Sequence, residues 1–249
     1  MTHAFVTGGG SGIGLAIAAR LSAIGMDVTI MGRDAARLAA ACQRYPKLRA
    51  VAGSVAERDQ VRRCVGEAVT ITGPIDIAVN GAGYVKSAPF LKFSESDWAG
   101  TMATNLMGAV HVIHEVLPGM RERDFGRIVN VGSTASLKAY PYVAGYVASK
   151  HALLGLTRAL AVELARTGIT VNAVCPGYTE TDLLQGAIDT IKSKTGRSED
   201  DARKTLAAVN PQGRLVDPEE VASAVEWLVS EDSHSITGQA IAIAGGEVM

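Results

Sequence analysis

The chain has 249 residues, near the upper size that one α/β core holds before a chain divides into domains. Its 24 lysines and arginines almost balance 25 acidic residues, giving a formal net charge of -1, so its charge does not favour nucleic acid or an anionic membrane as a partner. An apolar content of 47% with 20% charged residues excludes an intrinsically disordered chain.

Cysteine usage and the N-terminal residues bear on the compartment. The three cysteines form no CxxC pair and leave one thiol unpaired in any disulfide scheme, so we expect reduced thiols in a cytoplasmic protein. No basic start followed by an apolar stretch is visible at the N-terminus, so we expect no secretory signal. No window reaches about 18 uninterrupted apolar residues, so we expect no membrane span.

Short apolar runs alternate with longer segments of helical periodicity. Several runs are apolar throughout, which is typical of strands covered on both faces in a parallel sheet. We predict strands at residues 3–7, 28–31, 48–52, 75–80, 127–132, 169–175 and 240–243. We predict helices at residues 13–25, 35–44, 61–71, 95–119 and 143–166. This alternation predicts one α/β domain, 1–249, with a doubly wound parallel sheet of about seven strands and helices on both faces.

Residues 178–217 depart from this alternation. They show weak periodicity and no predicted strand over about 40 residues, and irregular segments of that length in a compact domain are usually functional or mobile. The segment contains five basic residues whose charge is offset by neighbouring acids. These basic residues are Lys192, Lys194, Arg197, Arg203 and Lys204. We interpret the segment as a substrate lid with some helix; a solvated pair of surface helices is the alternative.

A glycine-rich turn lies between the first predicted strand and the first predicted helix. Residues 7–14 read Thr-Gly-Gly-Gly-Ser-Gly-Ile-Gly. Gly8 permits the turn, Gly12 lets the backbone approach a pyrophosphate, and Gly14 lets the helix pack closely on the sheet. The helix N-terminus adds unpaired N–H groups and a partial positive charge, so the pattern predicts a dinucleotide site. Its glycine spacing differs from the general G-x-G-x-x-G fingerprint.

Tyr146 and Lys150 lie four residues apart in the predicted helix 143–166, so they share one helix face. Lowering a tyrosine pKa from near 10 to about 7 requires roughly 4 kcal/mol in favour of the phenolate. One cation about 4 Å away supplies energy of that order at an effective dielectric constant near 20. Ser133 directly follows a predicted strand, at the sheet edge where the glycine-rich turn also lies. A hydroxyl, a tyrosine-lysine pair and a dinucleotide cradle are therefore expected at one edge of the sheet.

Five elements occur in this order: the glycine-rich turn, Asn105, Ser133, the Tyr146 and Lys150 pair, and the Pro176-Gly177 turn. Together they resemble the short-chain dehydrogenase/reductase family over essentially the whole chain, from Thr7 to Gly246. The resemblance implies a single-domain Rossmann-like fold. It also implies that the catalytic residues are Asn105, Ser133, Tyr146 and Lys150.

The resemblance implies a role for each of these residues. Tyr146 donates a proton to the carbonyl oxygen during reduction, and Ser133 hydrogen-bonds that oxygen and stabilises its developing charge. Lys150 lowers the tyrosine pKa and binds the nicotinamide ribose, while Asn105 holds a water that relays protons. Cofactor contacts are implied for Gly8, Gly10, Ser11, Gly12, Ile13, Gly14, Arg33, Ser54, Val55, Asn80, Ala82, Tyr146, Lys150, Pro176, Gly177, Thr179 and Thr181.

Two positions depart from the family pattern. Residues 80–83 read Asn-Gly-Ala-Gly where the family has Asn-Asn-Ala-Gly, and the missing second Asn should loosen one local set of hydrogen bonds. Ser54 stands where an Asp often contacts adenine, although serine can still donate or accept a hydrogen bond. Neither departure touches the four residues with implied catalytic roles.

The end of the second predicted strand bears on the choice of dinucleotide. Gly32 is followed by Arg33, which leaves room for a 2′-phosphate and supplies a counter-charge, as in NADPH-preferring members of the family. Asp34 precedes the predicted helix 35–44, and its position suits an N-cap. We expect NADP(H); NAD(H) is the alternative cofactor, and Arg33 is then an ordinary solvated arginine.

Residues 165–177 read Ala-Arg-Thr-Gly-Ile-Thr-Val-Asn-Ala-Val-Cys-Pro-Gly and most resemble polyketide ketoreductases and 3-oxoacyl reductases. The expected function is NADP(H)-dependent hydride transfer to or from a ketone or secondary alcohol, with a 3-oxoacyl thioester or polyketide-like ketone as the small-molecule substrate. One alternative is an NAD-dependent 3-hydroxyacyl-CoA or cyclic alcohol dehydrogenase. A remote alternative is a non-catalytic dinucleotide-binding protein, which need not keep all four reacting groups. The resemblance also implies that long helices pair between subunits in a homotetramer; the sequence alone would equally accept a dimer.

His111 and His114 precede Glu115 in the predicted helix 95–119. The order His-x-x-His-Glu fits neither the zincin nor the inverted zincin pattern, and no third ligand is evident. We therefore expect no metal site, and a structural or subunit-interface role for both histidines.

Overall fold

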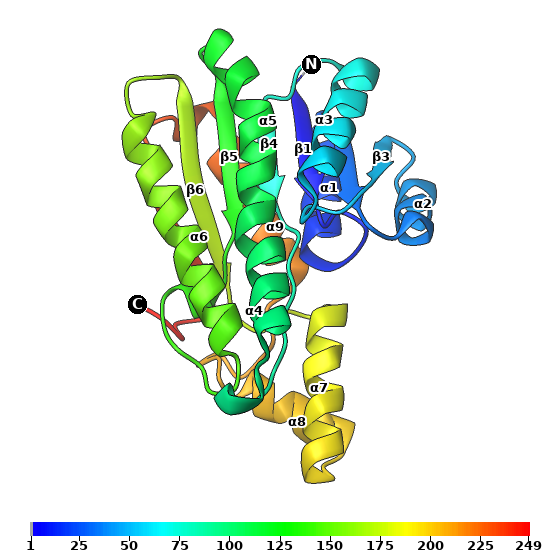
Figure 1. Ribbon diagram of the computed structural model, residues 1–249, viewed down its shortest axis with the longest axis vertical. Coiled ribbons are helices and arrows are strands. Elements are labelled where there is room, and N and C mark those ends of the chain that lie inside the picture. Colours follow the sequence, from blue (N-terminus) through cyan, green and yellow to red (C-terminus); the bar gives the residue numbers. More distant parts are fainter. Residues whose placement is uncertain (1) are drawn as a thin grey trace.

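The computed structural model describes residues 2–249, and its centre is one seven-stranded parallel sheet (Figure 1). The strand order is β3-β2-β1-β4-β5-β6-β7, so the direction of winding reverses between β1 and β4. The strands are β1 (His3–Thr7), β2 (Asp27–Gly32), β3 (Leu48–Ala52), β4 (Ile77–Asn80), β5 (Gly126–Val131), β6 (Ile169–Pro176) and β7 (Ala240–Ile243). The predicted α/β fold class is confirmed, and every predicted strand is present with small shifts at its ends.

Helices cover both faces of the sheet, and each face has its own hydrophobic core. One core lies under α1 (Gly12–Ala23), α2 (Ala35–Arg44) and α9 (Pro218–Val229). The other lies under α3 (Arg58–Thr72), α5 (Gly108–Glu122) and α6 (Ala144–Glu163). Every residue of β5 and β6 is buried, including the polar side chains of Arg127, Asn130, Thr170 and Asn172.

The long helix predicted at 95–119 is interrupted. The structure has α4 (Glu95–Met102), a π-helical turn (Ala103–Met107) and then α5. The prediction of one regular helix is therefore wrong at its centre, because a π turn accommodates one extra residue without ending the helix. Asn105 lies in that turn and is buried, so the interruption places one of the predicted site residues.

Residues 178–217 form a pair of helices below the sheet in Figure 1. The helices are α7 (Asp182–Thr195) and α8 (Glu199–Ala207), and they share a small core of Leu184, Ile188, Ala202 and Leu206. A single parallel bridge, Thr179 with Val216, joins the two ends of the segment. The expected helix content is present, and the segment has a small core of its own.

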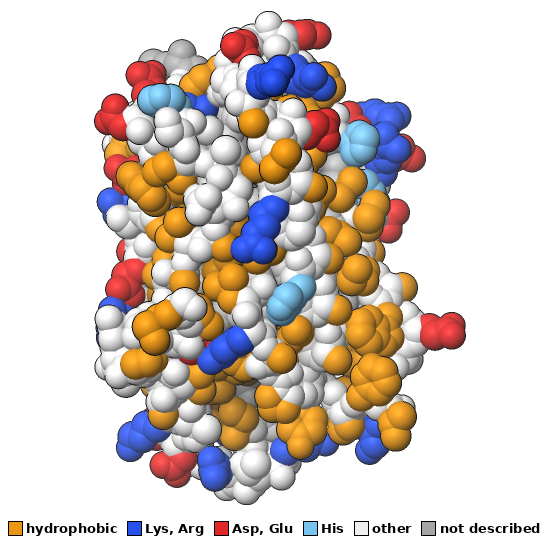
Figure 2. All heavy atoms as spheres, turned by 90° about the vertical axis from the view of Figure 1, so that its left-hand side faces the viewer, with side chains coloured by type: hydrophobic (Ala, Val, Ile, Leu, Met, Phe, Trp, Pro, Cys, Tyr) orange, Lys and Arg blue, Asp and Glu red, His pale blue; other side chains and the backbone are white. Residues whose placement is uncertain are grey.

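Figure 2 shows the side of the molecule on which α6 lies. Hydrophobic side chains are spread over the middle of this face, and most charged side chains lie toward its ends. Among residues 2–249, no helix combines the length and the apolar character needed to cross a membrane.

Candidate functional site

The glycine-rich turn is built so that three of its positions accept only glycine. Gly8 and Gly12 have positive φ angles of 71° and 53°, where side chains are strained. A Cβ at Gly8 would lie 2.8 Å from the Gly81 carbonyl oxygen, and a Cβ at Gly14 would overlap the carbonyl oxygen of Gly8. The glycines therefore leave space at the N-terminus of α1 and let it lie close to the end of β4.

Thr7 connects this turn to the strand end beside it. Its Oγ1 accepts hydrogen bonds from the N–H groups of Gly81 (3.1 Å) and Ala82 (3.2 Å). A Cβ at Gly81 would lie 2.7 Å from the Thr7 carbonyl oxygen, so the second Asn of the family pattern would need the backbone to move. The departure at Gly81 therefore permits a close approach of β1 and β4.

Ser133, Tyr146 and Lys150 meet at the carboxyl end of β5. Ser133 lies two residues beyond that strand and is near enough to the Tyr146 side chain to lower its pKa, while its Oγ accepts from the Ala135 N–H at 3.1 Å. Helix α6 brings Lys150 under the tyrosine, with Nζ 5.6 Å from the Tyr146 ring centroid. Lys150 is only 4% exposed, and its Nζ donates to the Val131 carbonyl oxygen at 2.7 Å.

Asn105 is fixed in place by three hydrogen bonds. Its Oδ1 accepts from the Tyr84 N–H at 2.7 Å, and its Nδ2 donates to the Tyr84 carbonyl oxygen at 2.8 Å. Nδ2 also donates to Ser149 Oγ at 2.9 Å, and Ser149 in turn donates to the Tyr146 carbonyl oxygen at 2.8 Å. Sequence reasoning missed Ser149, although its place directly before Lys150 on the same helix was a usable signal.

Burial shifts both ionisable groups of the tyrosine-lysine pair. It raises the pKa of Tyr146, although the hydrogen bond from Ser133 acts in the opposite direction. It also lowers the pKa of Lys150 to about 8. The expected lowering of the tyrosine pKa by Lys150 is therefore not present in the protein chain alone, where the phenol is the favoured form at neutral pH.

Arg33 and Asp34, the two residues directly after β2, have different roles. Asp34 Oδ1 accepts from the N–H groups of Ala36 (2.9 Å) and Arg37 (3.1 Å), which confirms it as the N-cap of α2. Arg33 is exposed and is therefore available to a phosphate. Arg37, which sequence reasoning did not single out, reaches across to Asp182 at 2.6 Å. Arg37 and Asp182 line a surface pocket of about 230 Å³. Its other lining residues are Gly10, Ser11, Leu15, Ala40, Ala41 and Arg44.

The other predicted cofactor positions lie on loops that end the strands. The Thr179 hydroxyl donates to the Gly177 carbonyl oxygen at 2.9 Å, and Thr181 caps α7 beside Gly12. The Ser54 N–H donates to Gln60 at 2.9 Å. His111 Nδ1 is 2.9 Å from the carbonyl oxygen of Val55, a structural contact. Within residues 2–249, no three His, Cys, Asp or Glu side chains are grouped to hold a metal ion.

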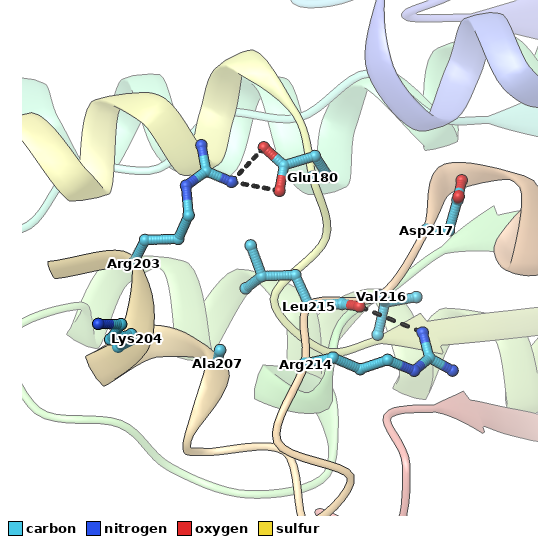
Figure 3. A pocket seen from close by; sticks show the side chains of 8 residues that line it. All are labelled: Glu180, Arg203, Lys204, Ala207, Arg214, Leu215, Val216 and Asp217. Carbon is cyan, nitrogen blue, oxygen red and sulfur yellow. Dashed lines mark hydrogen bonds and ion pairs between the residues drawn. The ribbon is translucent and has the colours of Figure 1, made fainter. Parts of the chain in front are cut away.

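A second pocket, of about 510 Å³, lies beside α8 (Figure 3). Its lining comes from Glu180, α8 and residues 214–217, and it contains none of the predicted catalytic residues. Arg203 pairs with Glu180, and Arg214 pairs with Glu220 at 2.7 Å. The two arginines are therefore already neutralised, which disfavours this pocket as a phosphate site.

The C-terminal segment adds a residue that sequence reasoning missed. The Glu247 side chain is only 2% exposed, and it contacts both the loop after Ser133 and the Pro176-Gly177 turn. No local sequence signal marks this position, because the contact depends on how the chain end folds back onto the sheet.

Comparison with known proteins adds a family and several relatives. The family model for short chain dehydrogenase matches residues 2–192. The chain is 36% identical over 244 residues to acetoacetyl-CoA reductase of Rhizobium meliloti, covering 98% of this chain and 97% of that protein. It is 35% identical over 251 residues to D-beta-hydroxybutyrate dehydrogenase of Cupriavidus necator, covering 98% and 97%. The crystal structure of an actinorhodin polyketide ketoreductase variant with NADPH has a TM-score of 0.96 and 36% identity, covering 99% of this chain and 97% of that one.

Proposed function

The chain belongs to the short-chain dehydrogenase family as an oxidoreductase enzyme, and we propose that it reduces a ketone to a secondary alcohol with NADPH. The proposed substrate is a 3-oxoacyl thioester or a polyketide-like ketone. The observation that carries the proposal is the meeting of Ser133, Tyr146 and Lys150 at the carboxyl end of β5. That end of the sheet also holds the glycine-rich turn.

The cradle between β1 and α1 fits a dinucleotide. The glycines leave open the space that Cβ atoms would fill, and the free N–H groups of α1 suit a pyrophosphate. Asn80 Oδ1, at the end of β4, is a buried acceptor without a partner among residues 2–249. Arg33 and Gly32 suit a 2′-phosphate, and an NADPH-bound relative supports that preference. When bound, NADPH supplies the hydride for the carbonyl carbon.

The protein groups then supply the proton and stabilise charge. Tyr146 carries its proton at neutral pH because burial raises its pKa, so it is ready to protonate the carbonyl oxygen. The Ser133 hydroxyl lies beside the phenol and hydrogen-bonds the same oxygen as negative charge develops there. The ammonium group of Lys150 stabilises the phenolate that remains, and it binds the ribose. Asn105, fixed by Tyr84 and Ser149, holds the water that returns a proton.

The substrate class rests on the relatives. Acetoacetyl-CoA is the substrate named for the Rhizobium meliloti relative, and a polyketide ketone is implied by the name of the structural relative. A test with acetoacetyl-CoA, as a short 3-oxoacyl thioester, and with a cyclic ketone, each with NADPH and NADH, separates these classes. Activity on none of them would contradict the proposed substrate class.

The test of the chemistry is Tyr146→Phe, with Tyr142→Phe as its matched control. Tyr142 lies just before α6, is 63% exposed and carries no assigned role. We expect Tyr146→Phe to lower kcat by about 10²- to 10⁴-fold, because the general acid is lost. The dissociation constant for NADPH should stay the same. A Tyr146→Phe enzyme with the kcat of the parent would rule out the proposed acid.

The test of the cofactor is Arg33→Ala. We expect its preference for NADPH over NADH, measured as the ratio of kcat/KM values, to fall at least about tenfold because the counter-charge to the 2′-phosphate is removed. Arg166→Ala is the control: Arg166 is exposed beyond the end of α6, before β6 begins at the opposite edge of the sheet. An unchanged ratio in Arg33→Ala would contradict the assignment.

The oxidative direction is a second candidate, favoured by the likeness to D-beta-hydroxybutyrate dehydrogenase. In that direction Tyr146 accepts the proton of the alcohol instead of giving one. Turnover of 3-hydroxybutyrate or a 3-hydroxyacyl-CoA with NAD⁺, faster than ketone reduction with NADPH, would favour this candidate.

A further inference from the structure

Glu247 is a buried carboxylate that joins two segments of the site. It follows β7 near the C-terminus, and its side chain is only 2% exposed. One of its oxygens faces the loop after Ser133, and the other faces the turn after β6. A buried carboxylate between two such loops calls for a reason beyond packing.

On the side of the Ser133 loop, Glu247 Oε1 accepts from the Tyr140 hydroxyl and pairs with Lys138 Nζ at 3.0 Å. The Tyr140 oxygen also lies 2.6 Å from Thr134 Oγ1. A phenol has one proton, and here it goes to the carboxylate, so Thr134 must be the donor in the second bond. The chain Thr134 to Tyr140 to Glu247 thus fixes the residue next to Ser133.

The pKa of Tyr140 agrees with this direction of donation. Burial raises it most, the bond to Glu247 raises it further, and the bond with Thr134 acts the other way. A hydroxyl that donates to the phenol oxygen stabilises the phenolate and so opposes the rise. Tyr140 therefore remains a donor to Glu247 throughout the neutral range.

On the other side, Glu247 Oε2 is buried and has no hydrogen-bond partner among residues 2–249. It lies against Gly177, where a Cβ would be 3.1 Å from Oε2. The Tyr178 ring packs edge-on against Tyr140, with centroids 6.4 Å apart. The carboxylate therefore lies beside the Gly177 backbone while it pairs with the Ser133 loop.

The chain end is shaped to bring Glu247 to this place. Gly245 and Gly246 have φ angles of 59° and 92°, which only glycine adopts readily. Asn210 packs so closely on Gly245 that a Cβ there would overlap its side-chain oxygen. The Glu247 N–H closes the turn on the Ala244 carbonyl oxygen at 3.1 Å. The backbone conformation of Gly245 and Gly246 thus brings Glu247 to this position.

We propose that Glu247 is a positioning residue that clamps the Ser133 loop to the Pro176-Gly177 turn. It acts on the Ser133 hydroxyl through Tyr140 and Thr134, and on the turn through its Oε2, which fills the space beside the Gly177 backbone. The proposal rests on the proposed function, because the two clamped segments are those that would face the carbonyl and the nicotinamide. Losing the clamp disturbs the relative placement of these groups without removing any of them.

The experiment compares Glu247→Ala, Glu247→Gln, Tyr140→Phe and the double variant Glu247→Ala/Tyr140→Phe. Glu226→Ala is the matched control, since Glu226 also pairs with a basic residue, Arg20, but joins α9 to α1. The measurements are kcat and KM for the ketone, the NADPH dissociation constant from cofactor fluorescence, and the melting temperature. Hydrogen exchange of the full-length protein without cofactor follows residues 133–142 and 176–181.

We expect Glu247→Ala to lower kcat by about 10- to 100-fold through misplacement of reacting groups, with KM for the ketone and NADPH affinity near those of the parent. Glu247→Gln, which keeps an oxygen acceptor for Tyr140, should recover part of that loss. The double variant should lose little more than Glu247→Ala alone, because both changes break one chain of contacts. Hydrogen exchange should rise in both segments for Glu247→Ala and in neither for Glu226→Ala.

Three results would overturn the proposal. The first is parental kcat in Glu247→Ala, the second is a double variant whose losses multiply, and the third is exchange that rises in only one of the two segments. A lowered melting temperature with unchanged kcat would also contradict the proposal, because it would show that Glu247 only stabilises the fold. If the parent reduces no ketone, the proposed function fails, while hydrogen exchange still decides whether the clamp exists.

Discussion

Lys150 is the buried cation of the site, and it is tied to the protein before any ligand binds. Its Nζ donates to the Val131 carbonyl oxygen at 2.7 Å and lies under the Tyr146 ring. Burial lowers its pKa to about 8, so the ammonium form dominates at neutral pH and is lost as the pH rises through that value. The charge that compensates a Tyr146 phenolate is therefore present only on the acid side of about pH 8.

This gives a prediction for pH dependence. We expect kcat for ketone reduction to be level near neutral pH and to fall as the pH rises through about 8, because Lys150 loses its proton there. Lys150→Arg keeps a cation with a pKa above about 12 and should move this decline to higher pH, even with a lower maximum. The measurement is kcat against pH for both enzymes. A decline at the same pH in Lys150→Arg would show that another group sets it.

The residues of the site differ in whether the sequence alone could predict their position. Ser133, Tyr146 and Lys150 could be predicted to meet because helix spacing and strand-end position are local properties. Glu247 could not, since its burial depends on a tail that folds back between two loops. The rise in the Tyr146 pKa could not be predicted either, because burial is a property of the folded chain and outweighs the opposing effect of Ser133.

At the scale of elements, the strands were predictable and the helix interruption was not. The predicted bounds match β1, β3 and β7 at both ends. Of these strands only β1 is buried throughout, whereas β3 and β7 lie at the two edges of the sheet and are partly exposed. The π turn at 103–107 escapes such reasoning because the helical period continues on each side of it. The strand β4 begins at Ile77 rather than 75, since Ile75 is buried without pairing.

The packing of α1 against the glycine-rich turn gives a second prediction. Gly14→Ala places a Cβ on the Gly8 carbonyl oxygen, so α1 must shift away from the cradle. We expect NADPH to bind at least about tenfold more weakly, and the free energy of unfolding to fall by about 1–3 kcal/mol from overpacking. Fluorescence titration and urea denaturation measure the two effects.

Gly66→Ala is the control for this change. Gly66 lies inside α3, and a Cβ there meets no atom within 4 Å. Alanine should raise helix stability there by about 0.5–1 kcal/mol and leave NADPH binding unchanged. If Gly14→Ala bound NADPH as tightly as Gly66→Ala, the close approach of α1 to the turn would have no role in binding.

At the scale of the whole molecule, the parallel sheet brings all the proposed reacting groups to one edge. The α7–α8 pair lies beyond that edge and touches the cofactor side through the Arg37–Asp182 pair and the contact of Thr181 with Gly12. A lid role for 178–217 remains a prediction, supported by the separate core of the pair. A lid of this kind would keep its two helices together through that core.

The exposed face of α6 gives a third prediction. Val162 is 79% exposed on α6, on a side of the molecule rich in hydrophobic side chains (Figure 2). We expect the protein to be a homotetramer in solution and Val162→Glu to have a smaller mass by light scattering, because a charge would be buried at a helix pairing. Val69→Glu, on α3, is the control and should keep the parental mass. A parent with the mass of one chain would contradict the prediction.

The π turn at 103–107 holds one residue more than a regular helix needs between α4 and α5. Deleting one residue there would restore a regular helix and keep the faces of α4 and α5 in register, because the turn absorbs the extra residue locally. Trp98 would keep its place beside Phe93, whose ring packs 5.3 Å from it and against Gly145 of α6. Single-residue insertions and deletions between Ser94 and Gly108 should therefore fall within 103–107, and gaps in sequence alignments of the family belong there.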